Sequence, residues 1–275
     1  MNQSFGTVLR APNLSELAIV KAAEALITQY TDLVGRDYVR RVGVWFDDLY
    51  DKVIYPEYEI ELVDNEDLGS YGGVPVLGRY DVIPKTANID RSLRVGSGDP
   101  RRTFTLFHEV GGHGVLQGEF LRRQLIGSRS PVSIVTTDDG LRGRTEGILE
   151  WQANVFAKHA AAPTWLVIEK VCETFSLKQP FRFVGRRKYG LYVRGTDLER
   201  RATTADELCR LIARQVQCYF WGLSLEALGY RIKECKLVVD LTRPDVPLRR
   251  LAHERKWRDR QTAGKSVRAL VTSMG

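Results

Sequence analysis

The segment from Thr105 to Gln117, TLFHEVGGHGVLQ, constrains the fold of this chain more than any other. It holds two of the four histidines of the chain, His108 and His113, which are five residues apart. In a regular α-helix each residue advances by about 100°, so side chains five residues apart diverge by about 140°. One wider turn with i→i+5 hydrogen bonds would bring both imidazoles to the same face. Two successive glycines between them make that turn easy, because neither has a Cβ to clash. We therefore predict a helix that carries one π-type turn.

The residue types in this helix suit a metal ion. Neutral imidazoles bind Zn²⁺, and a site with three protein ligands leaves a fourth position for a water molecule, whose pKa can then fall to about 7. Glu109 follows the first histidine directly and is the candidate base that takes a proton from this water. His108 and His113 are the candidate metal ligands. His159 and His253 are the other two histidines, and we expect neither to bind metal.

A third protein ligand is expected from the segment TEGILEWQANVFAKH, residues 145–159. Glu146 and Glu150 are four residues apart, so on a helix both carboxylates share one face and can point at one metal ion. One of them would bind the metal while the other accepts an N–H from a ligating imidazole. The spacing leaves both assignments open.

The remaining periodicity predicts an α+β protein. Helices are expected over 14–30, 37–53, 102–113, 145–162, 204–219 and 223–236, strands over 58–63, 79–83 and 86–90, and a small hairpin over 181–195. Thr204-Ala-Asp-Glu207 has the pattern of a capping box. A length of 275 residues fits one catalytic domain with a smaller appendage. We predict a domain over 1–165 and a helical, basic region over 166–275.

Charge and apolar content suggest the compartment and the partners. No window approaches eighteen apolar residues and the N-terminus lacks a signal-peptide pattern, so we expect a cytoplasmic protein with no membrane span. The four cysteines are expected to be buried, reduced thiols. The net charge of +7 comes mainly from residues 243–275, where nine Lys and Arg face three acids, and residues 181–201 form a second basic run. Such patches attract nucleic acid or an acidic protein, although a solvated face is the commoner explanation.

Two motifs resemble those of the ImmA/IrrE family of metallopeptidases. Residues 101–109, RRTFTLFHE, resemble the helix that the family writes RxRFTLAHELGH, and residues 150–157, EWQANVFA, followed by Pro163, resemble ExxANxFAxxLLMP. Asn88-Ile89-Asp90 is similar to the end of the family's strand IxIN. A weaker likeness covers 223–238, which is similar to a helix-turn-helix-like segment. Close resemblance extends over about residues 85–163.

The resemblance implies a zincin-like core with His108, His113 and Glu150 as zinc ligands and Glu109 as the catalytic base. It implies a cytosolic zinc-dependent endopeptidase, with Mn²⁺ as the alternative metal. Its substrate would be a regulatory protein, a transcriptional repressor or an antitoxin, as in relatives from mobile elements or the DNA-damage response. An extended substrate is expected to pair with a strand near 82–90. The residues leave the donor to the oxyanion unassigned: Tyr189, Tyr192 and Tyr230 are candidates, although a structural role is the commoner one for each.

The chain departs from this family by one glycine, since it has HExxGH where the family has HExxH. The longer motif is similar to that of the dipeptidyl peptidase III family, in which a downstream EExxxE would make Glu146 the ligand. The Ala-Asn-x-Phe-Ala context favours the first family and Glu150. Two alternatives follow. In the first, the chain is a non-catalytic regulator that binds DNA or protein through its basic half. In the second, it is an exopeptidase that removes residues from a free amino terminus.

Overall fold

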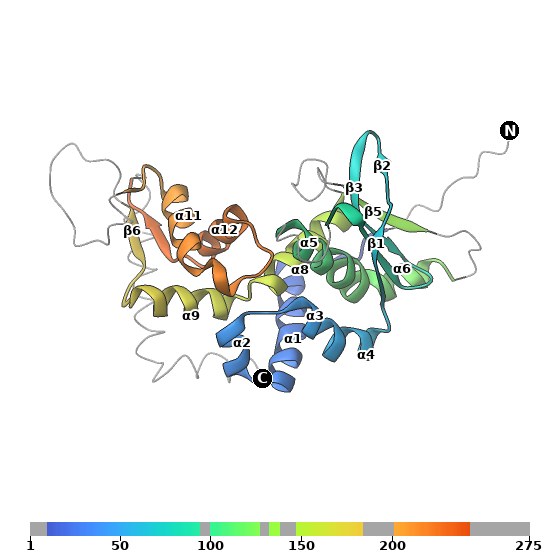
Figure 1. Ribbon diagram of the computed structural model, residues 1–275, viewed down its shortest axis with the longest axis horizontal. Coiled ribbons are helices and arrows are strands. Elements are labelled where there is room, and N and C mark those ends of the chain that lie inside the picture. Colours follow the sequence, from blue (N-terminus) through green and yellow to red (C-terminus); the bar gives the residue numbers. More distant parts are fainter. Residues whose placement is uncertain (1–9, 94–99, 127–131, 138–146, 184–200, 243–275) are drawn as a thin grey trace. The chain divides into compact units, whose positions relative to one another are not determined.

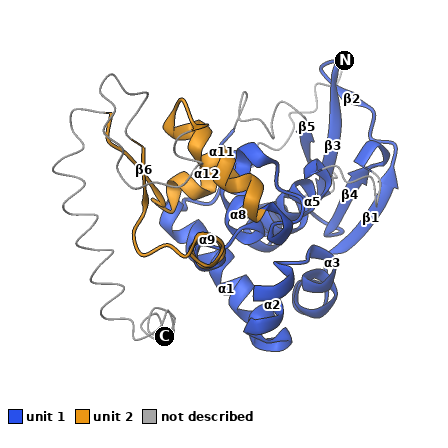
Figure 2. Cartoon of the chain, turned by 60° about the vertical axis from the view of Figure 1, so that its left-hand side comes forward, with its two compact units in different colours: residues 1–166, 217–227 blue, residues 167–216, 228–275 orange. Residues whose placement is uncertain are grey.

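The computed structural model describes residues 10–93, 100–126, 132–137, 147–183 and 201–242 (Figure 1). The chain divides into two compact units, coloured separately in Figure 2. Unit 1 contains residues 1–166 and 217–227, and unit 2 contains residues 167–216 and 228–275. The short segment 217–227 thus returns to the first unit. The fold of the described residues mixes helices with small sheets, and none of their helices is long and apolar enough to cross a membrane.

Unit 1 begins with the predicted amphipathic helix, α1 (Glu16–Val34). Ser15 caps it, and its hydroxyl accepts a hydrogen bond from the backbone N–H of Ala18 at 3.2 Å. Such a bond satisfies one of the donors that a helix start leaves unpaired. The helix buries one stripe of side chains, which consists of Ile19, Ala23, Leu26, Ile27 and Tyr30. This apolar face packs on helix α8, described below.

The predicted helix over 37–53 is divided in the structure. α2 (Arg36–Val42) ends at Gly43, whose φ of 84° leaves the helical region. The chain then forms α3 (Phe46–Leu49), a π-helical turn η1 (Tyr50–Ile54) and α4 (Tyr55–Tyr58). α4 ends at Glu59 in a left-handed conformation, so the next strand starts at Glu61 rather than at 58 as predicted.

Five strands form the sheet of unit 1: β1 (Glu61–Glu66), β2 (Ser70–Tyr71), β3 (Val74–Asp81), β4 (Thr86–Asp90) and β5 (Ser133–Thr137). β3 and β4 form the predicted antiparallel hairpin, with Gly78 opposite Ile89. β4 also pairs with β1 in parallel, and β3 also pairs with β2 and β5, both antiparallel. A short 3₁₀ helix, η2 (Arg91–Leu93), follows β4.

This pairing corrects the expectation that a strand near 82–90 receives the substrate. β4 already has a neighbour on each side, so it has no edge to offer. β5 pairs with β3 on one side only, and no other described strand covers its second edge. β1 also pairs on one side only among the described strands, and of these two strands β5 is the one that contacts Glu150, through Thr136, so its edge is the candidate.

A helical run crosses beneath the sheet: α5 (Pro100–Leu106), a π-helical segment η3 (Phe107–Gln117) and α6 (Gly118–Gln124). It continues past His113, where the sequence predicted its end. η3 packs against β3 and β4 and against α8 (Ile148–Ala161), which stops two residues before Pro163. Unit 1 is thus layered as sheet, η3, α8 and α1 (Figure 1).

Unit 2 contains α11 (Ala205–Val216) and a two-stranded parallel sheet of β6 (Phe181–Phe183) and β7 (Val238–Asp240). β6 thus has a distant parallel partner, and the rest of the predicted hairpin over 181–195 lies outside the described residues. One half of the capping box is confirmed, since the hydroxyl of Thr204 accepts from the N–H of Glu207 at 3.0 Å; the carboxylate of Glu207 accepts from the N–H of Thr203, one residue earlier than the motif predicts.

Three further elements link the units along the chain. α9 (Thr164–Phe175) leads from unit 1 into unit 2, η4 (Gln217–Tyr219) follows α11, and α12 (Leu225–Glu234) crosses the boundary at residue 227. The four cysteines are free thiols, but the expectation that all are buried is correct for Cys209 alone: Cys172 and Cys235 are half-buried and Cys218 is exposed.

Candidate metal centre

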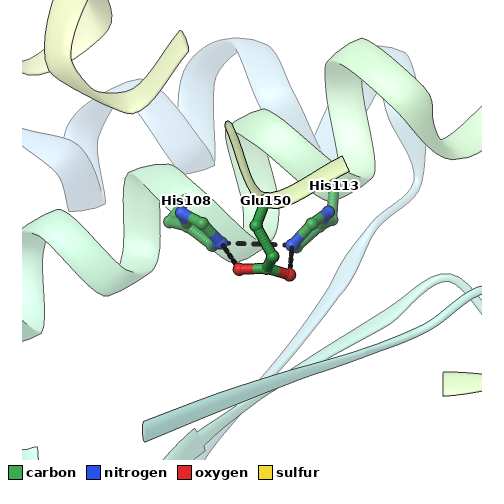
Figure 3. A group of neighbouring side chains, drawn as sticks. All are labelled: His108, His113 and Glu150. Carbon is green, nitrogen blue, oxygen red and sulfur yellow. Dashed lines mark hydrogen bonds and ion pairs between the residues drawn. The ribbon is translucent and has the colours of Figure 1, made fainter. Parts of the chain in front are cut away.

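Three side chains from two helices converge on one point of unit 1 (Figure 3). His108 and His113 lie on η3 and Glu150 lies in the first turn of α8. The two Nε2 atoms are 3.1 Å apart, and each is 3.1 Å from a different carboxylate oxygen of Glu150. Among the described residues, these three form a group whose ligand atoms all lie within 4.8 Å of one another. Two imidazoles and one carboxylate are the donor set of a three-ligand Zn²⁺ site with an open fourth position.

The π-helix brings the histidines together, as predicted from their spacing. It extends over eleven residues and not over a single turn. With i→i+5 hydrogen bonds, residues five apart return to one face, which is where His108 and His113 lie. Both imidazoles are fully buried, while the side chain of Glu150 keeps 16% of its surface exposed. The described part of the site therefore meets solvent on the Glu150 side.

The two glycines of the motif also allow η3 and α8 to approach closely. A Cβ at Gly111 would lie 2.7 Å from the ring of Phe156, and a Cβ at Gly112 would lie 2.5 Å from the Cβ of Ala153. Both distances are shorter than carbon atoms tolerate. Close packing of the two helices places Glu150 over the histidines, so the glycines serve this contact as well as the wider turn.

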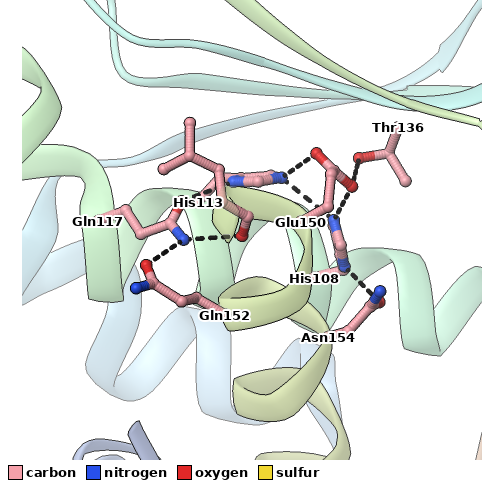
Figure 4. A network of polar contacts seen from close by, with 8 residues as sticks. His108, His113, Gln117, Thr136, Glu150, Gln152 and Asn154 are labelled. Atoms are coloured by element: carbon pink, nitrogen blue, oxygen red, sulfur yellow. Dashed lines mark hydrogen bonds and ion pairs between the residues drawn. The ribbon is translucent and has the colours of Figure 1, made fainter. Parts of the chain in front are cut away.

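Each imidazole is oriented by an amide side chain (Figure 4). Nδ1 of His108 is 3.0 Å from Oδ1 of Asn154, and Nδ1 of His113 is 2.9 Å from Oε1 of Gln117. An amide oxygen only accepts, so each Nδ1 carries the proton and each Nε2 faces the centre. Partners of this kind fix the tautomer and the ring orientation of metal-binding histidines.

Glu109 lies beside this group and is fully buried. Neither of its carboxylate oxygens has a hydrogen-bond partner among the described residues. Burial raises the pKa of Glu109, and the nearby charges of His113 and His108 act in the opposite direction. Burying a carboxylate without hydrogen-bond partners lowers the stability of the folded protein. Groups that transfer protons are often held in such surroundings, because these shift their pKa.

The charges of the candidate ligands depend on one another. Burial alone would raise the pKa of Glu150, but its hydrogen bonds to His108 and His113 lower it overall. Burial alone would lower the pKa of His113, but the hydrogen bond to Glu150 raises it to about 9. Without a metal ion, a proton on the imidazole therefore supplies the positive charge that the carboxylate attracts.

β5 contributes one side chain to the centre. The hydroxyl of Thr136 is fully buried and lies 3.4 Å from Oε2 of Glu150. This long contact links the sheet edge to the candidate ligand.

The other candidate residues are not brought to this point. Glu146, His253, Tyr189 and Tyr192 lie outside the described residues. His159 is buried on α8, and Tyr230 is exposed on the part of α12 that belongs to unit 2. The sequence predicted that one glutamate would orient an imidazole. In the described structure the side-chain amides of Asn154 and Gln117 have this position.

Four residues at this site were not predicted from the sequence: Asn154, Gln117, Gly78 and Thr136. Gln117 is four residues after His113, and Asn154 is four residues after Glu150, a helical spacing that was a usable signal for both. From the sheet, Gly78 lies against the side chain of Glu109 and Thr136 contacts Glu150, and no local pattern marks either residue.

No protein-family model matches the chain. No curated protein matches it at a significant level.

Proposed function

We propose that this chain is a zinc-dependent endopeptidase with a zincin-like core, similar to the ImmA/IrrE family, and that it cleaves a regulatory protein such as a repressor or an antitoxin. The observation that supports it is the convergence of His108, His113 and Glu150 within 4.8 Å beside a buried glutamate without partners. Zn²⁺ fits this donor set, and Mn²⁺ is the alternative.

His108, His113 and Glu150 would hold the metal. When bound, the metal would polarise the scissile carbonyl and make a water molecule acidic enough to react at neutral pH. Glu109 would take the proton of the attacking water and then deliver it to the leaving amine. Its raised pKa suits the first step, because a carboxylate with a raised pKa is a stronger base.

The open edge of β5 is the proposed binding site for the substrate backbone. An extended peptide that adds to a sheet edge gains main-chain hydrogen bonds. Thr136 lies on this strand and contacts Glu150, so a peptide on this edge would run past the metal centre.

The matched variant for the test is Glu109→Gln. Both proteins are loaded with Zn²⁺ and incubated with a lysate, and new protein amino termini are identified by mass spectrometry. Because Glu109 is not among the ligands, Glu109→Gln should retain about one Zn²⁺ per chain. We expect the wild type alone to produce new internal termini, and loss of one catalytic base typically slows such a reaction by a factor of about 10²–10⁴.

The other outcomes separate the alternatives. Removal of short pieces from free amino termini, with no internal cleavage, would identify an exopeptidase of the HExxGH type. Zinc binding with no new termini in either sample, together with salt-sensitive DNA binding that survives Glu109→Gln, would identify a non-catalytic regulator. Failure of the wild type to bind any metal would contradict the proposal itself.

A further inference from the structure

A chain of buried amides connects the candidate metal centre to the segment before α1. Gln117 accepts from His113 through Oε1, and its Nε2 donates to the backbone carbonyl of Leu149 at 2.9 Å and to Oε1 of Gln152 at 3.1 Å. Nε2 of Gln152 in turn donates to the backbone carbonyl of Pro12 at 2.7 Å. Gln117 is fully buried and Gln152 is 1% exposed, so water does not compete strongly with these bonds. Figure 4 shows the two glutamines beside His113.

Two backbone carbonyls determine the direction of every bond in this chain. A carbonyl only accepts, so the group of Gln152 that faces Pro12 must be its NH₂, and its oxygen must face Gln117. Nε2 of Gln117 must then donate to Gln152 and Leu149, which turns Oε1 of Gln117 towards His113. Nδ1 of His113 therefore carries a proton, and Nε2 is directed at the centre. A flip of either amide would place two donors or two acceptors face to face.

The segment that provides the Pro12 carbonyl is held in place by a third glutamine. Oε1 of Gln124 accepts from the N–H of Arg10 at 2.9 Å, and Nε2 of Gln124 donates to the carbonyl of Arg10 at 2.9 Å. Gln124 ends α6, seven residues after Gln117 on the same helical run. These bonds are exposed, whereas the bond from Gln152 to Pro12 is buried. The segment is thus attached at two points, of which Pro12 alone connects to His113.

We propose that Gln117 and Gln152 are positioning residues that carry the orientation of the Pro12 carbonyl to His113, so that the segment Arg10–Pro12 is part of the metal centre. This inference rests on the proposed metal-binding function. It extends the set of residues that orient His113 to a segment about a hundred positions earlier in the sequence. It also predicts that a change in the residues bonded to Pro12 alters the affinity for metal.

The decisive variants are Gln152→Met and Gln152→Glu in the full chain, with Gln124→Met as the matched control. All three are close to glutamine in size, and thermal unfolding checks that each protein folds. Met removes both bonds of Gln152, and an ionised Glu cannot donate to Pro12. Gln124→Met loosens the same N-terminal segment but leaves the amide chain to His113 intact. Two quantities are measured: the dissociation constant for Zn²⁺ in competition with a chelator, and the NMR signal of the His113 Nδ1 proton in the metal-free protein.

Partners that orient a metal-binding histidine typically contribute a factor of about 10–100 to affinity. We expect both Gln152 variants to bind Zn²⁺ at least about tenfold more weakly than the wild type, and Gln124→Met to change the affinity less than about threefold. We also expect the Nδ1 proton to be protected from exchange in wild type and Gln124→Met, and to be lost from the spectrum in both Gln152 variants.

Equal affinities and an unchanged Nδ1 signal in all four proteins would overturn this inference while leaving the metal centre in place. A wild type that binds no metal would refute the proposed function, and the Nδ1 signal would still decide whether Gln152 orients His113. A loss of affinity in Gln124→Met as large as in Gln152→Met would also overturn the inference, because it would show a general effect of loosening the segment.

Discussion

Gly78 on β3 faces the side chain of Glu109 so closely that a Cβ at this position would lie 2.6 Å from Cγ of Glu109. The absence of a side chain in the sheet therefore makes the space that the candidate base occupies. Gly78 thus limits where the carboxylate of Glu109 can lie.

Gly78→Ala should displace Glu109 and reduce turnover while metal binding persists. A displacement of about 1 Å in a reacting group can slow a reaction by about 10²-fold, and the overpacking should cost about 1–3 kcal/mol of stability. The comparison of kcat with Zn²⁺ content separates the two effects.

Gly147→Ala is the control for this substitution, because a Cβ there meets no atom within 4 Å and φ is −72°. Equal turnover in Gly78→Ala and Gly147→Ala would show that the position of Glu109 does not depend on β3.

Gly112→Ala should weaken metal binding by separating the two helices that carry the ligands. The new Cβ would lie 2.5 Å from the Cβ of Ala153, and His113 on η3 would move away from Glu150 on α8. We expect a loss of about 1–3 kcal/mol in the free energy of unfolding and a clear loss of Zn²⁺ affinity. The double variant Gly112→Ala/Ala153→Gly removes the Cβ–Cβ contact and should recover part of both. No recovery would place the cause in the contacts that remain, with the Cα of residue 153 at 2.6 Å and its carbonyl oxygen at 3.1 Å.

Asn154→Leu should weaken Zn²⁺ binding by a factor of about 10–100, because His108 loses the acceptor that orients its ring. Asn154→Asp keeps an oxygen at this place and should lose much less. Chelator competition measures both affinities. If Leu and Asp give the same value, the orientation of His108 does not depend on this hydrogen bond.

The sequence predicted the local part of this site and missed the tertiary part. The five-residue spacing and the paired glycines were sufficient to predict a wider turn between His108 and His113. They were not sufficient to predict its length of eleven residues, which is sustained by the packing of Gly111 and Gly112 against α8. That packing involves residues about forty positions away, so no local pattern contains it.

The candidate third ligand, Glu150, was also only partly predictable from local sequence. Spacing alone left Glu146 and Glu150 equivalent, because residues four apart share a helix face. The structure brings Glu150 to the histidines through the packing of α8 on η3, while Glu146 lies outside the described residues. For the sheet, the sequence predicted the hairpin of β3 and β4. The parallel pairing of β1 with β4 and the pairing of β5 with β3 are long-range contacts, and the alternation of apolar residues does not encode them.

Zn²⁺ affinity should increase with pH up to about 9. The pKa of His113 is about 9 in the metal-free protein, so below that value a metal ion must displace a proton from the imidazole. The affinity should fall about tenfold for each pH unit below 9, and each Zn²⁺ bound at pH 7 should release about one proton. Chelator competition from pH 6 to 9 and proton release in weak buffer measure the two quantities. An affinity that does not change between pH 7 and 9 would contradict this assignment of the proton.

The metal-free protein should show the opposite dependence in its stability. The folded-state pKa of His113 is raised from 6.5 to about 9, so its bond to Glu150 contributes fully below pH 6.5 and is lost as the pH rises through 9. A shift of this size corresponds to a loss on the order of 3 kcal/mol in the free energy of unfolding. Urea unfolding in the presence of a chelator measures it. Glu150→Gln is the control, because His113 then lacks the carboxylate that contributes most to raising its pKa, and the loss should become much smaller. Since metal binding strengthens over the same pH range, the stabilities of the zinc-loaded and metal-free proteins should diverge as the pH rises. Parallel curves would mean that proton and metal do not compete for His113.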